Sequence, residues 1–227
     1  IALFLNTPAS SDWTSVRTQY GEQQSITLPD GSEVTLNGNS TLRYSDNWDK
    51  IGNEREVWLE GEGFFSVTKH QNQGQNHLTK FTVHANDLLV EVRGTQFNVQ
   101  NRPENTQVVL HEGKVLIRHE QQDSVLLRPN ELAELDTRAG IRKKTVNAQH
   151  FISWKDQVLI FSEEPIRNIL DRLENTYGWQ INVQDSSWLQ QKYTGSVPTN
   201  RTELLFDKFS LLYELDIAYQ NRQVTIE

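Results

Sequence analysis

The 227-residue sequence contains no cysteine, which excludes disulfide bonds, thiolate metal ligands and a cysteine nucleophile. It also has no surplus of positive charge, because 30 acidic residues against 22 Lys and Arg give a formal net charge of -8. Such a chain repels phosphates on average, so its charge argues against a nucleic-acid partner. The length allows two modest domains, each with a non-covalent core.

A long hydrophobic run is missing as well. The five residues Ile1–Leu5 are wholly apolar, but a polar segment with Pro8 follows, whereas a membrane-spanning helix needs about 20 apolar residues. On composition alone two interpretations remain open: the outer end of a transmembrane helix that starts upstream, or a buried N-terminal strand or remnant of a signal peptide.

The segment from Gly21 to Asn37 predicts a β-hairpin. Ile26 and Leu28 before the turn, and Val34 and Leu36 after it, alternate with polar residues at the period of a half-buried strand. Between them, Pro-Asp-Gly-Ser at 29–32 supplies a fixed φ, a side chain that bonds its own backbone and a residue that accepts positive φ.

From Trp13 to about Val146 the chain continues as short apolar runs separated by Gly, Asn, Asp and charged residues, and helical periodicity is almost absent. Strands at such close spacing favour a β-sandwich or a coiled β-solenoid over a barrel.

After Trp154 the pattern changes to strand, helix and strand. A strand is expected at 158–161, then Ser162 as helix N-cap, then a helix that ends at Gly178, and a returning strand at 179–183. The expected buried face of this helix consists of Ile166, Ile169, Leu170, Leu173 and Tyr177.

The same pattern then repeats. It predicts a strand at 193–197, a capped helix entry at 198–202, a helix that buries Leu205, Phe209 and Leu212, and strands at 215–219 and 223–226. Two tandem βαβ units are therefore expected at the C-terminal end.

Several segments resemble, in the same order, the periplasmic domain of FecR-type anti-sigma regulators. After the hairpin they are Arg55–Val67 (REVWLEGEGFFSV), Phe81–Val83, Val90–Val99 (VEVRGTQFNV), Val108–Val115 (VVLHEGKV) and Val125–Glu131 (VLLRPNE). The family usually has Pro-Gly where this chain has Pro129-Asn130, a mild departure because Asn tolerates the left-handed conformation. The resemblance implies a twisted two-layered β domain.

The C-terminal part resembles the small N-terminal domain fold of secretins and TonB-dependent transporters (STN), which also ends many FecR-type proteins. The resemblance rests mainly on Phe161–Ile166 (FSEEPI) and Leu173–Gly178 (LENTYG). Mostly β architecture followed by a small α/β (βαβ-βαβ) STN-like domain is therefore expected, divided into 1–12 (end of a membrane helix and linker), 13–149 and 150–227.

The resemblance also implies partners and a location. It implies the periplasmic signalling region of a single-pass inner-membrane regulator in a Gram-negative bacterium, anchored by an upstream helix. Its partners are then the N-terminal signalling domain of a TonB-dependent outer-membrane transporter and, through a cytoplasmic domain, an extracytoplasmic-function sigma factor.

No pattern in the sequence indicates an enzyme, a cofactor or a metal site. The six histidines do not show the pair spacing of common zinc sites, and the Gly61-Glu62-Gly63 motif precedes a strand instead of a helix. Glu60 and Glu62 would face the same side of a regular strand, but a turn or a hydrogen-bonding role is favoured over catalysis.

A carbohydrate-binding β module is the alternative function. The chain has six tryptophans, and Trp48 and Trp188 stand in polar surroundings, where they are expected to be exposed.

For the signalling function, we expect the docking surface on the C-terminal unit. Trp188, Tyr193, Arg201 and Tyr219 are the candidate contacts, because aromatic residues and arginine are enriched at binding hot spots. The last strand, with Val224 and Ile226, is expected to offer an open edge for strand addition.

Overall fold

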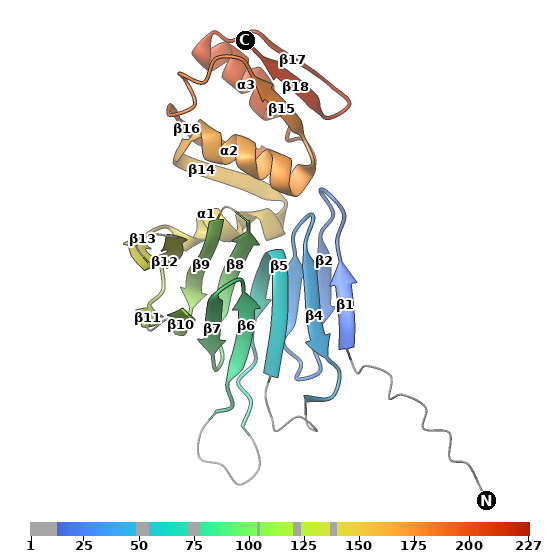
Figure 1. Cartoon of the computed structure of the whole chain (residues 1–227), viewed down its shortest axis with the longest axis vertical. Coiled ribbons are helices and arrows are strands. Elements are labelled where there is room, and N and C mark those ends of the chain that lie inside the picture. Colours follow the sequence, from blue (N-terminus) through green and yellow to red (C-terminus); the bar gives the residue numbers. More distant parts are fainter. Residues whose placement is uncertain (1–12, 49–54, 72–77, 104, 120–123, 137–139) are drawn as a thin grey trace, which may run out of the picture.

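The computed structural model describes residues 13–48, 55–71, 78–103, 105–119, 124–136 and 140–227, and within them the chain forms two units (Figure 1). A β domain comes first, and a smaller α/β unit sits over one end of it. The apolar stretch Ile1–Leu5 lies outside the described residues. Within the described ranges, no helix combines the length and the apolar character needed to cross a membrane.

The described part of the β domain contains thirteen strands, of which β5 is the longest. Their bounds are β1 Trp13–Arg17, β2 Gln24–Thr27, β3 Glu33–Leu36, β4 Thr41–Ser45, β5 Arg55–Ser66, β6 Phe81–Ala85, β7 Leu88–Val92, β8 Gln96–Arg102, β9 Asn105–Glu112, β10 Val115–His119, β11 Ser124–Leu127, β12 Glu131–Asp136 and β13 Gly140–Thr145.

Strand β5 belongs to both layers of the β domain. Its first half pairs with β4 and β6, and its second half pairs with β3 and β8. The exchange occurs at Gly61, whose φ is +96° and where a Cβ would overlap Ser40. Only glycine combines this conformation with so close a neighbour, so Gly61 allows one strand to pass from one layer to the other.

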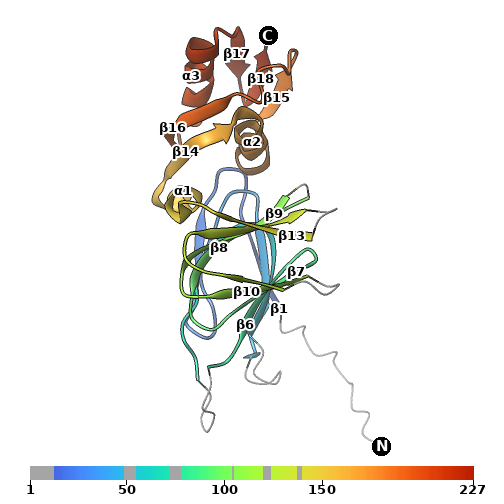
Figure 2. The ribbon, with the colours of Figure 1, turned by 90° about the vertical axis from the view of Figure 1, so that its left-hand side faces the viewer.

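The ribbon in Figure 2 shows the β domain from the side. The two layers that meet at β5 enclose a common apolar core. β1, β4, β6, β7, β10 and β11 extend the first layer, and β2, β3, β8, β9, β12 and β13 extend the second. Leu42, Val57 and Leu59 of the first layer belong to the same buried cluster as Phe65 and Phe97 of the second. The predicted mostly β, two-layered fold is confirmed.

The predicted hairpin is present between β2 and β3. Gly31 has a φ of +79°, and the Asp30 carboxylate accepts hydrogen bonds from the Ser32 backbone N–H (2.9 Å) and hydroxyl (2.7 Å). The same carboxylate lies 2.7 Å from the guanidinium of Arg55, and both side chains are almost fully buried. The turn is therefore tied to the start of β5.

The C-terminal unit follows two short helices, α1 Ala148–Ile152 and the 3-10 helix η2 Ser153–Asp156. Its elements are β14 Val158–Pro165, α2 Ile166–Arg172, the π-helix η3 Leu173–Tyr177, β15 Gln180–Val183, β16 Lys192–Pro198, α3 Leu204–Tyr213, β17 Ile217–Gln220 and β18 Gln223–Ile226.

Each βαβ unit contributes strands to both small sheets. β14 pairs with β16 in one antiparallel sheet, whereas β15 is parallel to β18, which also pairs with β17. Neither βαβ unit thus forms a sheet by itself, and the two are interlocked around one apolar core. The predicted small α/β unit is confirmed in this form.

The start of the first helix differs from the prediction that Ser162 is its N-cap. Ser162 lies within β14, which continues to Pro165 through a bulge with Glu163 at a φ of +52°. The pairing of Glu164 with Tyr193 extends the strand, so sheet pairing prevails over a plausible capping sequence. The end of the helix is as predicted, since Gly178 has a φ of +73°.

The predicted apolar face of α2 and η3 is fully buried, but that of α3 is only partly so. All five predicted residues of the first face are in the core. In α3, Leu205 and Phe209 are buried, whereas Leu212 is 59% exposed. Phe206 is buried as well, so the buried face of α3 includes Leu205, Phe206 and Phe209 and leaves out Leu212.

The two units meet along α1 instead of at a loop. Ala148 packs with Val109 and Leu132 of the β domain, while Ile152 belongs to the core of the C-terminal unit. The division between residues 149 and 150 remains a prediction, and it falls inside this helix.

Candidate functional site: the C-terminal surface and the cleft between the units

Four of the six residues predicted to contact a partner are buried in the core of the C-terminal unit. They are Trp188 (6% exposed), Tyr193, Val224 and Ile226. The centroid of the Trp188 ring lies 6.4 Å from that of Phe209. The Tyr193 ring packs edge-on against the same Phe209 ring, with centroids 5.4 Å apart. Because they are buried, these side chains are not accessible to a partner. Aromatic residues are common in protein cores as well as at interfaces, so residue type alone did not distinguish the two roles.

The last strand, β18, is not the open edge that the sequence predicted. β18 is the central strand of its sheet, with β15 on one side and β17 on the other. The parallel pair β15–β18 joins segments about 40 residues apart, a contact that strand patterns do not reveal. Among the described residues, β17 pairs with β18 alone, so β17 is an edge of this sheet.

Arg201 and Tyr219 are at the surface, where they form a polar cluster with α3. The Tyr219 hydroxyl donates to Asp207 Oδ1 at 2.8 Å, and Arg201 Nε donates to Glu203 Oε1 at 2.9 Å. The hydrogen bond to Asp207 is the main cause that raises the Tyr219 pKa. These two residues remain predicted contacts.

Sequence reasoning missed the most exposed apolar residue of this region, Leu211. It is 81% exposed, it follows Asp207 by one helical turn, and exposed Leu212 is its neighbour. The sequence did contain a sign of this exposure, because α3 has more apolar residues than a single helix face can bury. We call Arg201, Leu211, Leu212 and Tyr219 the α3 surface.

Trp48, which was expected to be exposed, is buried in the β domain. Its ring packs edge-on against Phe81, with centroids 5.9 Å apart, and near Tyr44 at 6.5 Å. Both tryptophans on which the carbohydrate alternative rested are thus core residues.

The two units are joined by hydrogen bonds between η3 and two loops of the β domain. The Gly21 N–H donates to the Thr176 carbonyl oxygen at 2.9 Å, and Asn39 Nδ2 donates to the Asn175 carbonyl oxygen at 3.0 Å. Phe64 of β5 belongs to the apolar core of the C-terminal unit. The interface is therefore both polar and apolar.

Glu62 is the central polar residue of this interface. Its carboxylate is buried and accepts hydrogen bonds from Asn37 Nδ2 (2.7 Å) and Asn98 Nδ2 (2.9 Å). A guanidinium nitrogen of Arg172, on α2, lies 3.9 Å from Glu62 Oε1. A buried charge of the β domain is thus placed opposite a charge of the C-terminal unit.

Glu60 and Glu62 do not form a carboxylate pair. Glu60 is exposed and Glu62 is buried, because the positive φ of Gly61 ends the regular alternation of β5 between them. Glu62 therefore has the hydrogen-bonding role that the sequence favoured.

Arg102 lies beside this cluster and holds the loop at 38–39. Its guanidinium donates to the carbonyl oxygens of Asn39 (2.6 Å) and Gly38 (2.9 Å). Burial lowers the pKa of Arg102, and the charge of Glu62 opposes that shift.

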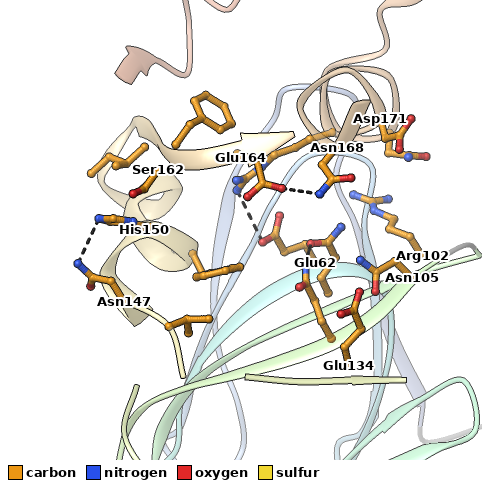
Figure 3. A pocket seen from close by; sticks show the side chains of 18 of the residues that line it. Glu62, Arg102, Asn105, Glu134, Asn147, His150, Ser162, Glu164, Asn168 and Asp171 are labelled. Atoms are coloured by element: carbon orange, nitrogen blue, oxygen red, sulfur yellow. Dashed lines mark hydrogen bonds and ion pairs between the residues drawn. The ribbon is translucent and has the colours of Figure 1, made fainter. Parts of the chain in front are cut away.

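A cleft of about 390 Å³ opens between the units next to Glu62. Figure 3 shows Glu62, Arg102, Asn105 and Glu134 of the β domain on one side and Asn168 and Asp171 of α2 across from them. The far end is formed by residues of α1 and β14, including His150 and Ser162. Within the described residues, no group of three or more His, Asp or Glu side chains is placed to hold a metal ion.

Comparisons with known proteins agree with this architecture. The model of the family "FecR protein" matches residues 14–116, and the model "FecR, C-terminal" matches residues 158–226. Among curated proteins, none has a sequence that matches this chain.

Two crystal structures of a candidate anti-sigma factor from Parabacteroides distasonis are similar over nearly the whole chain. They superpose with TM-scores of 0.79 and 0.80 at 26% sequence identity, covering 94% of this chain and 98% of the other. The family models cover both units, and the structural match extends across them. The chain therefore belongs to the FecR family, and it is a signalling regulator of the FecR type.

Proposed function

We propose that the chain is the periplasmic signalling region of a single-pass inner-membrane anti-sigma regulator in a Gram-negative bacterium. In this proposal it detects the state of a TonB-dependent outer-membrane transporter and controls an extracytoplasmic-function sigma factor through a cytoplasmic domain. The family match over both units supports a role in signalling. The anchor, the location and both partners are part of the proposal.

The observation that carries the proposal on this chain is the α3 surface. Leu211 and Leu212 are exposed on a helix whose other apolar residues are buried or partly buried, and exposed Tyr219 lies on the edge strand β17 next to α3. An apolar patch rimmed by polar residues is typical of a protein interface. A free strand edge beside it offers backbone hydrogen bonds to an added strand.

This surface suits a partner that changes state. A partner shifts an equilibrium only if its affinity differs between two states, and no covalent step is needed for that. We therefore assign to the α3 surface the contact with the transporter signalling domain, and we expect transporter occupancy to change its affinity.

A binding experiment tests the proposal. The chain is immobilised, and the purified N-terminal signalling domains of the TonB-dependent transporters of the same genome are titrated onto it. We expect one of them to bind saturably, and Leu211→Ser and Tyr219→Ala each to weaken that binding at least about tenfold, as hot-spot residues do.

The matched control is Leu126→Ser on β11, which also replaces an exposed leucine (51%) but in the β domain. It should bind like the native chain. The proposal fails if no transporter domain binds, and the α3 surface is rejected if Leu126→Ser and Leu211→Ser have equal effects.

A further inference from the structure

The cleft between the two units has the size and the position of a ligand site. Its volume of about 390 Å³ falls within the usual range for small-molecule pockets, roughly 300 to 1,000 Å³, and such pockets often form where domains meet. Its walls come from β8, β9 and β12 on one side and from β14 and α2 on the other. A molecule in the cleft would touch both units at once.

The charges in the wall nearly cancel, since four carboxylates (Glu62, Glu134, Glu164 and Asp171) stand among three cationic side chains (Arg102, Lys144 and Arg172). Glu134 lies 3.7 Å from Lys144 Nζ, Glu62 lies 3.9 Å from Arg172, and Arg102 is held by two carbonyl oxygens. A phosphate or a polyamine would meet charges of both signs here, and its own charge would displace one of these pairs. The cleft therefore favours a ligand with no net charge.

The remaining polar groups in the wall are mostly amides. Side-chain amides have both donors and acceptors, as hydroxyl groups do. Gln107 Nε2 donates to Gln100 Oε1 at 2.6 Å, which leaves the Gln107 oxygen as an acceptor, and Asn168 Nδ2 donates to Glu164 at 2.6 Å, which leaves the Asn168 oxygen. These contacts fix the orientation of the two amides.

Two buried polar atoms of wall residues have no hydrogen-bond partner in the described part of the chain: Asn105 Oδ1 and Arg172 Nε. One is an acceptor and the other is a donor. Buried polar groups are normally paired, so these two atoms beside the cleft are candidate hydrogen-bonding sites for a ligand. Hydroxyl groups suit atoms of both kinds, since they donate to an acceptor such as Asn105 Oδ1 and accept from a donor such as Arg172 Nε, once the buried atom is exposed by a movement of its side chain.

Apolar surface completes the site. Phe151 and Ile160 line the cleft and are each half-buried, whereas the Phe161 side chain belongs to the core of the C-terminal unit. The Phe151 ring offers a flat apolar contact of the kind that the C–H face of a sugar ring requires. We propose that this cleft binds a small, neutral, polyhydroxylated molecule, a mono- or disaccharide. This inference uses neither Trp48 nor Trp188, and it does not depend on the transporter proposal.

Binding there would strengthen the contact between the units. Because both walls contribute, the free energy of binding adds to the free energy that holds α2 against β5 and β8. A sugar would then act as a second input to the regulator, separate from the α3 surface.

Isothermal titration of the full chain tests the proposal with uncharged probes, namely glucose, xylose, N-acetylglucosamine, maltose and cellobiose. Citrate and spermidine serve as charged comparators. We expect at least one neutral probe to bind saturably, and Gln107→Ala and Asn168→Ala each to lower its affinity at least about tenfold.

Asn182→Ala is the matched control, since it removes an exposed amide from β15, outside the cleft. It should leave binding unchanged, and circular dichroism should show that all three variants keep the fold. The proposal is overturned if none of the neutral probes binds, if only a charged comparator binds, or if the control loses as much affinity as the cleft variants. None of these results bears on the transporter assay, whose variants lie outside the cleft.

Discussion

The carbonyl oxygen of Thr176 in η3 rests against Gly38 of the β domain so closely that a Cβ on Gly38 would overlap it. Gly38 does not have a positive φ, so its role is to allow this approach. We expect Gly38→Ala to separate the two units locally, break the hydrogen bond from Gly21 to Thr176, and cost about 1 to 3 kcal/mol of stability. Small-angle scattering and limited proteolysis at the junction would detect the change.

Gly31→Ala is the control for that experiment. A Cβ at Gly31 meets nothing within 4 Å, but the residue has a φ of +79°. This variant should lose about 1 kcal/mol from backbone strain and keep the arrangement of the units. If both variants scatter like the native chain, Gly38 does not control the docking of the units.

The buried pair of Asp30 and Arg55 should be the most sensitive ion pair of the β domain. Arg55 also donates to the carbonyl oxygens of Thr68 and Thr79, so it stays in place when its partner is removed. We expect Asp30→Ala to cost about 3 to 5 kcal/mol in urea denaturation, because it leaves a buried charge without compensation.

The comparison for this variant is an exposed ion pair. Lys192 and Glu163 lie 3.9 Å apart with both side chains more than half exposed. Lys192→Ala should cost no more than about 1 kcal/mol. Equal losses in the two variants would contradict the special role of the buried pair.

Local signals predicted the local structure of this chain well. The turn at 29–32, the buried face of α2 and η3, and the end of that helix at Gly178 each depend on residues close in sequence, and all three are confirmed. The resemblance of ordered motifs added the two-layered fold, which strand patterns alone left open between a sandwich and a solenoid.

Long-range pairing explains the errors. Ser162 has the properties of an N-cap, yet pairing with β16 keeps it in a strand, and the position of β18 is decided by a parallel partner from the other βαβ unit. Trp188 stands among polar residues in sequence but packs near Phe209 and Tyr213 of α3, a helix further along the chain. The cluster at Glu62 has the same origin, since Asn37, Asn98 and Arg172 come from three separate segments.

Glu62 provides a test of how that cluster holds the units together. Glu62→Ala removes the acceptor of two buried amides and the charge opposite Arg172, so we expect a loss of about 3 kcal/mol. Glu62→Gln should lose only about 1 kcal/mol. The side-chain oxygen Oδ1 of Asn98 has no partner among the described residues, so the Asn98 amide can turn and accept a hydrogen bond from the new glutamine. Denaturation in urea measures both, and equal losses would show that charge, and not hydrogen bonding, dominates at this position.

Tyr177 should make the chain less stable at high pH. Burial raises the pKa of Tyr177 to about 12, against a value of about 10 in the unfolded chain, and its hydroxyl has no hydrogen-bond partner among the described residues. Because the folded state favours the protonated phenol, the free energy of unfolding should be unaffected by this group below about pH 10. It should then fall as the pH rises towards 12, by about 2 to 3 kcal/mol in total.

Tyr177→Phe removes the ionisable group and a buried hydroxyl that lacks a partner among the described residues. The variant should therefore be as stable as the native chain at neutral pH or about 1 kcal/mol more stable, and its stability should fall less steeply above pH 10. Urea denaturation of both proteins from about pH 8 to about pH 11 measures the difference, and parallel curves would show that Tyr177 does not titrate in the folded state as its burial requires.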